Sequence, residues 1–431
     1  MSMFGLKEME VAELVRAISA PGLDREAIEE RFARATWTGL AEPGDRVAGA
    51  LVAALGAPRA LAAVVEKRAP ADLLGEVGAD EVGADPGGAD RAAADLGVAD
   101  LEQGMARWQP RVNSSNALLA LRQAARFGAA LRIPGDEAWP TGFDVFDTQG
   151  PLALWTRGTE SALLALSRSI ALVGARAATG YGEHVTMEAS AGLVDRGYSI
   201  VSGAAYGIDG MAHRAALASH GETIAFLAGG VDRFYPSGHD ALLTRIVEFG
   251  CVVSELPCGS PPTRWRFLQR NRLIAAASLA TVVLEAGWRS GSLNTAGHAA
   301  GFGRPLGAVP GPVTSAASAG CHRLLREFTA VCVTNADEMA ELAPLASGGP
   351  PIAEAGSPPA GPGRDSPSQV RVMDALSARS PRAATDIAAR SGMSVAEVQS
   401  VLGGLELEGV VREVERGWLK PAPKKPAATQ P

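Results

Sequence analysis

Residues 169–182, SIALVGARAATGYG, join a short apolar run to a glycine-containing turn and set the pattern for the central part of the chain. Six further short runs rich in β-branched residues follow, with stretches of helical character between them. These runs lie at residues 198–201, 223–227, 251–254, 281–284, 306–309 and 331–333. Short apolar runs that alternate with helices are typical of a parallel sheet covered on both faces. The sequence therefore predicts an α/β domain with a Rossmann-like, doubly wound parallel sheet.

Two changes of composition divide the 431-residue chain. Residues 75–100 are acidic and rich in Gly and Ala, so they cannot bury enough apolar surface to fold alone, and we expect a disordered insertion. Residues 344–367 are dense in Pro and Gly, which indicates an interdomain linker. The remaining parts are a helical N-terminal domain (1–150), the Rossmann-like domain (151–343), a small C-terminal domain that resembles a winged helix (368–420) and a disordered tail (421–431).

The net charge, the cysteines and the length of the apolar runs indicate the class of protein and its cellular location. The net charge of −7 argues against a surface coated in basic residues but not against a local basic groove. Four cysteines without a C-x-x-C pair indicate reduced thiols in a cytoplasmic protein. The apolar runs are far shorter than the roughly 20 residues of a membrane helix, and the first residues lack the apolar core of a signal peptide. We therefore expect a cytoplasmic protein with no membrane partner, and the six histidines show no metal-ligand spacing.

The turn after the first run does not fit a nucleotide-cofactor site. A dinucleotide fingerprint, G-x-G-x-x-G, needs a second glycine where the backbone approaches a pyrophosphate, but Arg176 stands at that position. The acid that would bind a ribose, expected about 20 residues further on, is also missing. No G-x-x-x-x-G-K-[ST] loop occurs either. We therefore predict no cofactor, no metal and no catalytic residue.

The same loops carry groups suited to phosphate. Gly174 and Arg176 precede one expected helix, and Ser202 and Gly203 precede the next. Helix N-termini present free N–H groups and a partial positive charge, which favour phosphate oxygens. A glycine turn of this kind also occurs where a helix only packs closely on its strand, so each turn alone leaves both interpretations open.

Residues 263–272, TRWRFLQRNR, give the sharper signal. They contain four arginines, two aromatic residues and no acid. Arginines bind backbone phosphates, and aromatic faces stack on unpaired bases with a gain of about 1–3 kcal/mol per base. Because duplex bases are already stacked, this combination favours single strands. The alternative is a solvated basic helix start with Trp265 or Phe267 in the core.

Several stretches resemble the DNA-processing protein A family (DprA, also called Smf), and they follow the family's order. Among them are IALVGARAATGYG (170–182), IVSGAAYGIDGMAHRAAL (200–217), RFLQRNRLIAAAS (266–278) and VVLEAGWRSGSLNTA (282–296). The resemblance implies a protein that binds and protects single-stranded DNA and loads RecA recombinase onto it, in DNA uptake and recombination. It also implies a homodimer formed through the Rossmann-like domain.

The resemblance implies a set of DNA-binding residues as well. Arg176, Arg270 and Arg272 are expected to bind phosphates, and Phe267 to stack on a base. Ser202, Gly203 and Ser292 are expected to donate hydrogen bonds. The whole set comprises Gly174, Arg176, Ser202, Gly203, Ala205, Arg264, Phe267, Arg270, Asn271, Arg272, Gly291 and Ser292.

Two other functions stay open. The central part also resembles the lysine-decarboxylase-like nucleoside-monophosphate phosphoribohydrolases, which use a P-G-G-x-G-T-x-x-E loop. Alignment of that loop on Gly291 places Thr295 where the catalytic Glu belongs, so the carboxylate that glycosidic hydrolysis needs is missing. The other function is a duplex-DNA regulator that uses the winged helix. Residues 394–411 of that domain contain three Glu and no Lys or Arg, which would repel phosphates and favours a protein-contact role.

Overall fold

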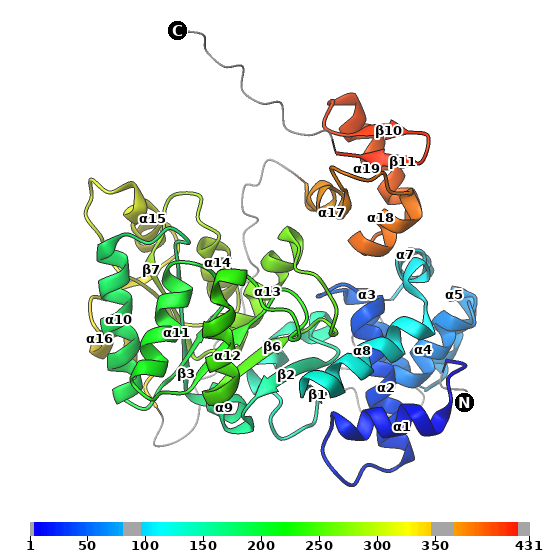
Figure 1. Ribbon diagram of the computed structural model, residues 1–431, viewed down its shortest axis with the longest axis horizontal. Coiled ribbons are helices and arrows are strands. Elements are labelled where there is room, and N and C mark those ends of the chain that lie inside the picture. The colour runs from blue at the N-terminus through cyan, green and yellow to red at the C-terminus, as the bar shows by residue number, and fades with distance from the viewer. Residues whose placement is uncertain (1–3, 81–95, 346–365, 421–431) are drawn as a thin grey trace.

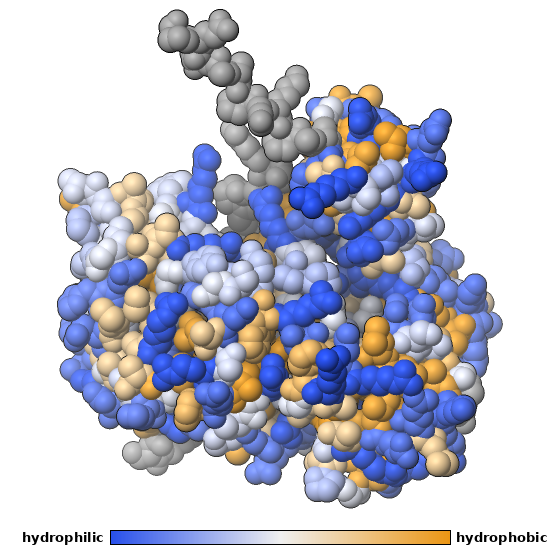
Figure 2. Space-filling model, in the orientation of Figure 1, coloured by the Kyte–Doolittle hydropathy of each residue, from blue (hydrophilic) through white to orange (hydrophobic). Residues whose placement is uncertain are grey.

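The computed structural model describes residues 4–80, 96–345 and 366–420. They form a helical N-terminal region, a central sheet with helices on both faces, and a small C-terminal region that lies above the N-terminal helices in the view of Figure 1. In Figure 2, hydrophilic and hydrophobic residues are intermixed over the visible face. Surface hydropathy on that face therefore does not mark a functional site.

The N-terminal region packs around two tryptophans. Trp37 and Trp108 are fully buried, and their rings meet edge to face at 5.1 Å between centroids. Asp24 and Asp45 begin two of the helices by accepting backbone N–H groups of the first turn. The helices are α1 (Glu8–Ala17), α2 (Arg25–Leu40), α3 (Arg46–Leu55), α4 (Ala57–Val65), α5 (Pro70–Asp80), α7 (Val98–Trp108) and α8 (Ser114–Phe127), with a 3-10 turn at Gln109–Arg111.

The expected acidic insertion differs from the structure at both ends. Residues 75–80 continue helix α5, and residues 98–100 begin helix α7. The centre of the insertion (81–95), most of the expected linker (346–365) and the tail (421–431) lie outside the described residues. Among the described residues, no single helix is long and apolar enough to cross a membrane. Helices α3 and α4 meet that criterion only as a pair, and the chain bends by 115° between them.

In the described part of the chain, nine strands form the central sheet, in the order β1-β2-β6-β5-β4-β3-β7-β8-β9. From β6 to β9 every neighbouring pair is parallel, which confirms the predicted doubly wound parallel sheet. All seven predicted runs are strands. The seven are β3 (Ser169–Gly174), β4 (Ser199–Ser202), β5 (Thr223–Phe226), β6 (Cys251–Ser254), β7 (Ala280–Glu285), β8 (Leu306–Ala308) and β9 (Val331–Cys332). Two antiparallel strands that the sequence did not predict, β1 (Ala130–Arg132) and β2 (Leu154–Gly158), extend one edge.

Strand β3 shows how the sheet separates two cores. Ile170 and Leu172 face the cluster with α10, α11 and α16, whereas Ala171 and Val173 face the cluster with α13, α14 and α15. This alternation is the two-residue period of a strand that is buried on both sides. The covering helices are α9 (Glu160–Leu164), α10 (Gly180–Asp195), α11 (Ile208–Ala218), α12 (Asp240–Phe249), α13 (Arg264–Ala277), α14 (Ser292–Gly301), α15 (Ala319–Glu327) and α16 (Ala336–Glu341).

The C-terminal region is a winged helix, as predicted. Its elements are α17 (Pro367–Ala375), α18 (Ala384–Ser391), α19 (Val395–Leu407) and the antiparallel pair β10 (Arg412–Val414) and β11 (Gly417–Leu419). The predicted capping box at the start of α19 is present. Ser394 Oγ accepts the backbone N–H of Glu397 at 3.2 Å, and the Ser394 N–H donates to the Glu397 carboxylate at 2.9 Å.

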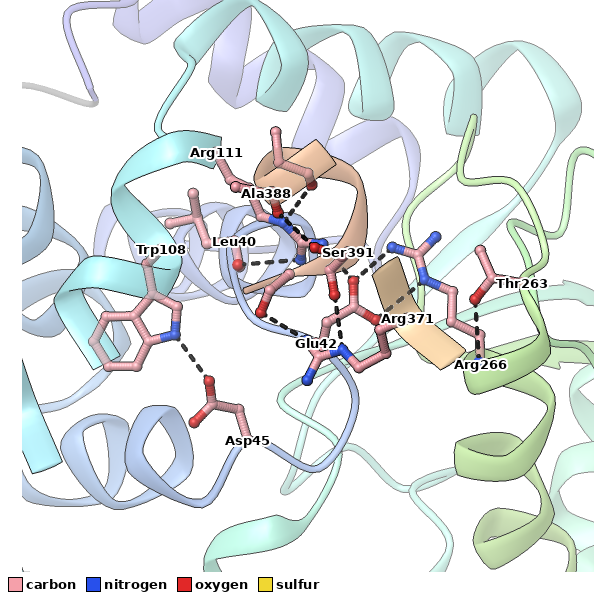
Figure 3. Close-up of polar contacts among 12 residues, drawn as sticks. Leu40, Glu42, Asp45, Trp108, Arg111, Thr263, Arg266, Arg371, Ala388 and Ser391 are labelled. Carbon is pink, nitrogen blue, oxygen red and sulfur yellow. Dashed lines mark hydrogen bonds and ion pairs between the residues drawn. The ribbon is translucent and has the colours of Figure 1, made fainter. Parts of the chain in front are cut away.

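One buried carboxylate joins the three regions (Figure 3). Glu42, which follows α2, accepts hydrogen bonds from Arg111 of the N-terminal region and from both Nε (3.1 Å) and Nη2 (2.7 Å) of Arg266 in α13. Arg111 also donates to the carbonyl of Ala389 in the winged helix at 2.7 Å. Burial alone would raise the pKa of Glu42, but Arg266 and Arg111, with a smaller effect of Arg371, lower it to about 2. The winged helix is therefore fixed against the start of α13.

Candidate nucleic-acid interface

A cleft of about 1050 Å³ opens where the strand order reverses. It is lined by the loops after β3, β4 and β7 and by the first turns of α13. Strand β3 continues to β4 on one side and pairs with β7 on the other, so the loops that follow them diverge at this point. Doubly wound folds bind ligands at such a switch point, outside the carboxyl ends of the strands.

Nine of the twelve residues predicted from the sequence line this cleft. The nine are Gly174, Arg176, Ala205, Arg264, Phe267, Arg270, Asn271, Gly291 and Ser292. Ser202 lies behind it, since its hydroxyl donates to the carbonyl of Leu172 inside the sheet at 2.6 Å. Gly203 also lies behind the cleft surface. A Cβ at Gly203 would come within 2.5 Å of the Arg270 guanidinium, so only glycine leaves room for that side chain.

The expectation that Arg272 binds phosphate does not fit its position. Its side chain is 7% exposed and forms an ion pair with Glu255, which is equally buried. Its guanidinium also lies 4.5 Å from the centroid of the Phe146 ring. Arg272 is not among the residues that line the cleft, and its buried ion pair with Glu255 supports the fold.

Arg270 places a fixed positive charge at the floor of the cleft. Its Nη1 donates to the carbonyl of Gly203 at 2.7 Å and to that of Phe226. Burial lowers the pKa of Arg270 to about 10, against the opposing effect of the nearby Asp209, so the group stays charged at neutral pH. Asp209 accepts the backbone N–H groups of Gly203 and Ala205, and burial raises its pKa. It therefore orders the loop after β4.

The described residues at the rim of the cleft are mainly basic, with Asp374 as an opposing acid. Arg176, Arg264 and Arg289 are exposed and line the opening. Asp374 of the winged-helix region also lines it, and its carboxylate accepts the backbone N–H of Trp265 at 3.1 Å, in the first turn of α13. When Arg270 and Asp209 are added to these rim residues, the described lining of the cleft contains more arginines than aspartates. The cleft therefore carries a net positive charge, although the whole chain is acidic. Such local focusing of charge is what attracts phosphates.

Sequence reasoning missed several cleft residues. Trp288 and Arg289 stand in the loop after β7, Tyr235 in the loop before α12, and Asp374 in α17. The glycine- and serine-rich loop that carries Trp288 is visible in the sequence, and an aromatic residue inside it was a usable signal. Asp374 had no such signal, because it lies 109 residues from Trp265 along the chain.

Comparisons with known proteins agree with this architecture. Residues 130–344 match the family model described as DNA recombination-mediator protein A, and residues 355–415 match the DprA winged helix domain. A putative DNA processing protein DprA of Mycobacterium tuberculosis is 45% identical over 303 residues, which cover 68% of this chain and 77% of that protein. Protein Smf of Escherichia coli is 38% identical over 241 residues, with 52% and 64% covered. The X-ray structure of DprA from Streptococcus pneumoniae aligns with a TM-score of 0.51 at 28% identity, over 64% of this chain and 94% of that one.

Proposed function

The chain belongs to the DprA/Smf family of DNA-processing proteins, and on this premise we propose that it binds single-stranded DNA in the cleft at the ends of β3 and β7. The observation that carries the proposal is one opening that combines exposed arginines with exposed aromatic rings. Arginines attract the phosphates of any sequence, and the rings stack on bases only where these are unpaired. The site residues are those of the predicted set that line the cleft.

The cellular role we propose is protection of incoming or exposed single-stranded DNA and loading of RecA recombinase onto it, in transformation and recombination. The description of the matching family, a recombination mediator, supports this role. We further propose a cytoplasmic homodimer that associates through the Rossmann-like domain. The winged helix is assigned to protein contacts, because Glu397, Glu406 and Glu408 of α19 and its end would repel phosphates.

We propose binding without catalysis, and so without a cofactor or a metal ion. The position that would carry the glycosidic carboxylate holds Thr295. Among the described residues, the carboxylates that line the cleft are those of Asp209 and Asp374, and each accepts backbone N–H groups of neighbouring loops. Both acids therefore have an ordering role that explains their presence.

Protection of DNA from a nuclease tests the role. We expect the intact chain to slow the degradation of a labelled poly-dT oligomer by a single-strand-specific nuclease, and to leave a duplex of equal length open to a duplex nuclease. Addition of RecA and ATP to the protected oligomer should then give faster filament assembly than on naked DNA. If the oligomer is protected but RecA filaments assemble no faster than on naked DNA, only the proposed loading role is contradicted. Release of free base from a nucleoside monophosphate would instead favour the hydrolase.

A further inference from the structure

The aromatic ring that the sequence points to, Phe267, is already surrounded by protein groups. The guanidinium of Arg176 lies 5.3 Å from its ring centroid and that of Arg270 lies 5.7 Å away. The Tyr235 ring approaches at 5.4 Å between centroids, tilted by 55°. These three neighbours take up part of the surface of the Phe267 ring, so less of that ring is open to a base. Phe267 therefore orders the arginines of the cleft.

Trp288 has the opposite environment. It stands in the loop between β7 and α14, lines the cleft and is 57% exposed. The guanidinium of Arg323, from α15, lies over its ring at 5.2 Å from the centroid. Arg323 is itself held by Glu327 at 2.7 Å. One face of the indole is thus backed by an anchored cation, which leaves the other face for a ligand.

The surroundings of Trp288 indicate the chemistry of that ligand. Its neighbours in the loop are Gly287, Arg289, Ser290 and Gly291, which are small or charged. A protein-binding site of this kind needs a contiguous apolar patch around its aromatic anchor, and these neighbours do not provide one. A nucleobase linked to phosphate fits better, since its flat apolar face meets the indole while the phosphate meets the exposed Arg289.

We propose that Trp288 is the main base-stacking platform of the cleft and that Tyr235, which is 48% exposed and lines the same cleft from another loop, is the second. The proposal rests on the proposed single-strand binding and names the side chains that contact bases. Phosphates are bound by the rim arginines and bases by these two rings. The site tolerates any sequence, because every base has a flat face.

The test compares the full-length protein with Trp288→Ala and Trp288→Phe, using a poly-dT oligomer and an abasic oligomer with the same number of phosphates. Trp288→Ala should weaken binding to poly-dT by about 5- to 150-fold, and Trp288→Phe should restore most of that affinity. Affinity for the abasic oligomer should be the same in all three proteins. The dependence of poly-dT affinity on salt should also keep its slope, because no charge is lost.

Two results would overturn the assignment. One is wild-type affinity of Trp288→Ala for poly-dT, and the other is an equal loss on poly-dT and on the abasic oligomer. Because Trp288 is exposed, the variant should unfold at the wild-type temperature, which is checked in parallel. If the wild type itself fails to bind poly-dT, the proposed function is wrong and the stacking assignment falls with it. If the wild type binds poly-dT and the Trp288 variants bind it with the same affinity, only the stacking assignment is wrong.

Discussion

Replacement of Glu42 with Ala is expected to lower the free energy of unfolding by about 3–5 kcal/mol. The change removes a carboxylate that is 8% exposed and leaves the buried guanidiniums of Arg111 and Arg266 without their acidic partner. The free-energy cost of leaving these charges buried without a partner exceeds the loss of their attraction to Glu42. Neither arginine can reach water unless the regions around the cluster separate. The measurement is urea unfolding followed by far-UV circular dichroism, with extrapolation to water.

Glu10→Ala is the matched control for this substitution. It deletes the same atoms from an ion pair with Arg122, in which both side chains are exposed. Exposed pairs of this kind contribute about 0–1 kcal/mol, so this variant should resemble the wild type. A Glu42→Ala protein no less stable than Glu10→Ala would show that the buried cluster does not hold the three regions together.

The Glu42 cluster should also make stability depend on pH in a defined direction. The folded protein lowers the pKa of Glu42 from 4.5 to about 2, so the charged form is the one that folding favours. The stabilisation is complete above pH 4.5 and is lost as the pH falls from 4.5 towards 2. The difference in unfolding free energy between the wild type and Glu42→Gln should therefore stay constant from pH 6 to 8 and shrink below pH 4.5. A constant difference down to pH 3 would contradict the assigned pKa.

The second large effect concerns DNA affinity. The double variant Arg176→Ala/Arg289→Ala removes two exposed charges from the rim of the cleft. Each phosphate contact on a single strand contributes about 0.7 to the slope of log K against log salt, so the slope should fall by about 1.4 and the affinity at 0.1 M salt by about 25-fold. Fluorescence anisotropy with a labelled poly-dT oligomer over a salt series measures both quantities.

Two further variants control for the net charge. Arg245→Ala removes an exposed arginine of α12 that does not line the cleft, and it should leave the slope unchanged. Asp374→Asn removes the acid at the rim and should strengthen binding, the opposite of the arginine variants. A loss of slope in Arg245→Ala equal to that expected for one rim arginine would mean that overall charge, and not the cleft, governs affinity.

The parallel strands were predictable because each is a short apolar run between turns. The winged helix and its capping box at Ser394 were predictable for similarly local reasons. Strands β1 and β2 were missed because they are short and depend on distant partners. Their pairing joins Leu131 to Trp155 and Trp155 to Ser254, contacts that no local pattern indicates.

The residues that line the cleft were mostly predictable from the sequence, but the different positions of the arginines within residues 263–272 were not. Within residues 263–272 the sequence shows four similar arginines, yet Arg264 is exposed at the cleft and Arg270 forms its floor. Arg266 and Arg272 turn instead to Glu42 and Glu255. Glu42 lies 224 residues from Arg266 along the chain, so only the folded structure separates the arginines that line the cleft from those that hold the regions together.

The proposed preference of the cleft for single strands is tested most directly by fluorescence anisotropy of the intact wild-type chain, with a labelled poly-dT oligomer and a duplex of equal length over the same salt series. A cleft that binds phosphates through arginines and bases through exposed rings predicts tighter binding of poly-dT than of the duplex at every salt concentration, with both affinities falling as salt rises. Equal or tighter binding of the duplex would contradict single-strand recognition and favour the winged helix as the DNA-binding element. Binding to neither would contradict both and return the glycosidic hydrolase to consideration.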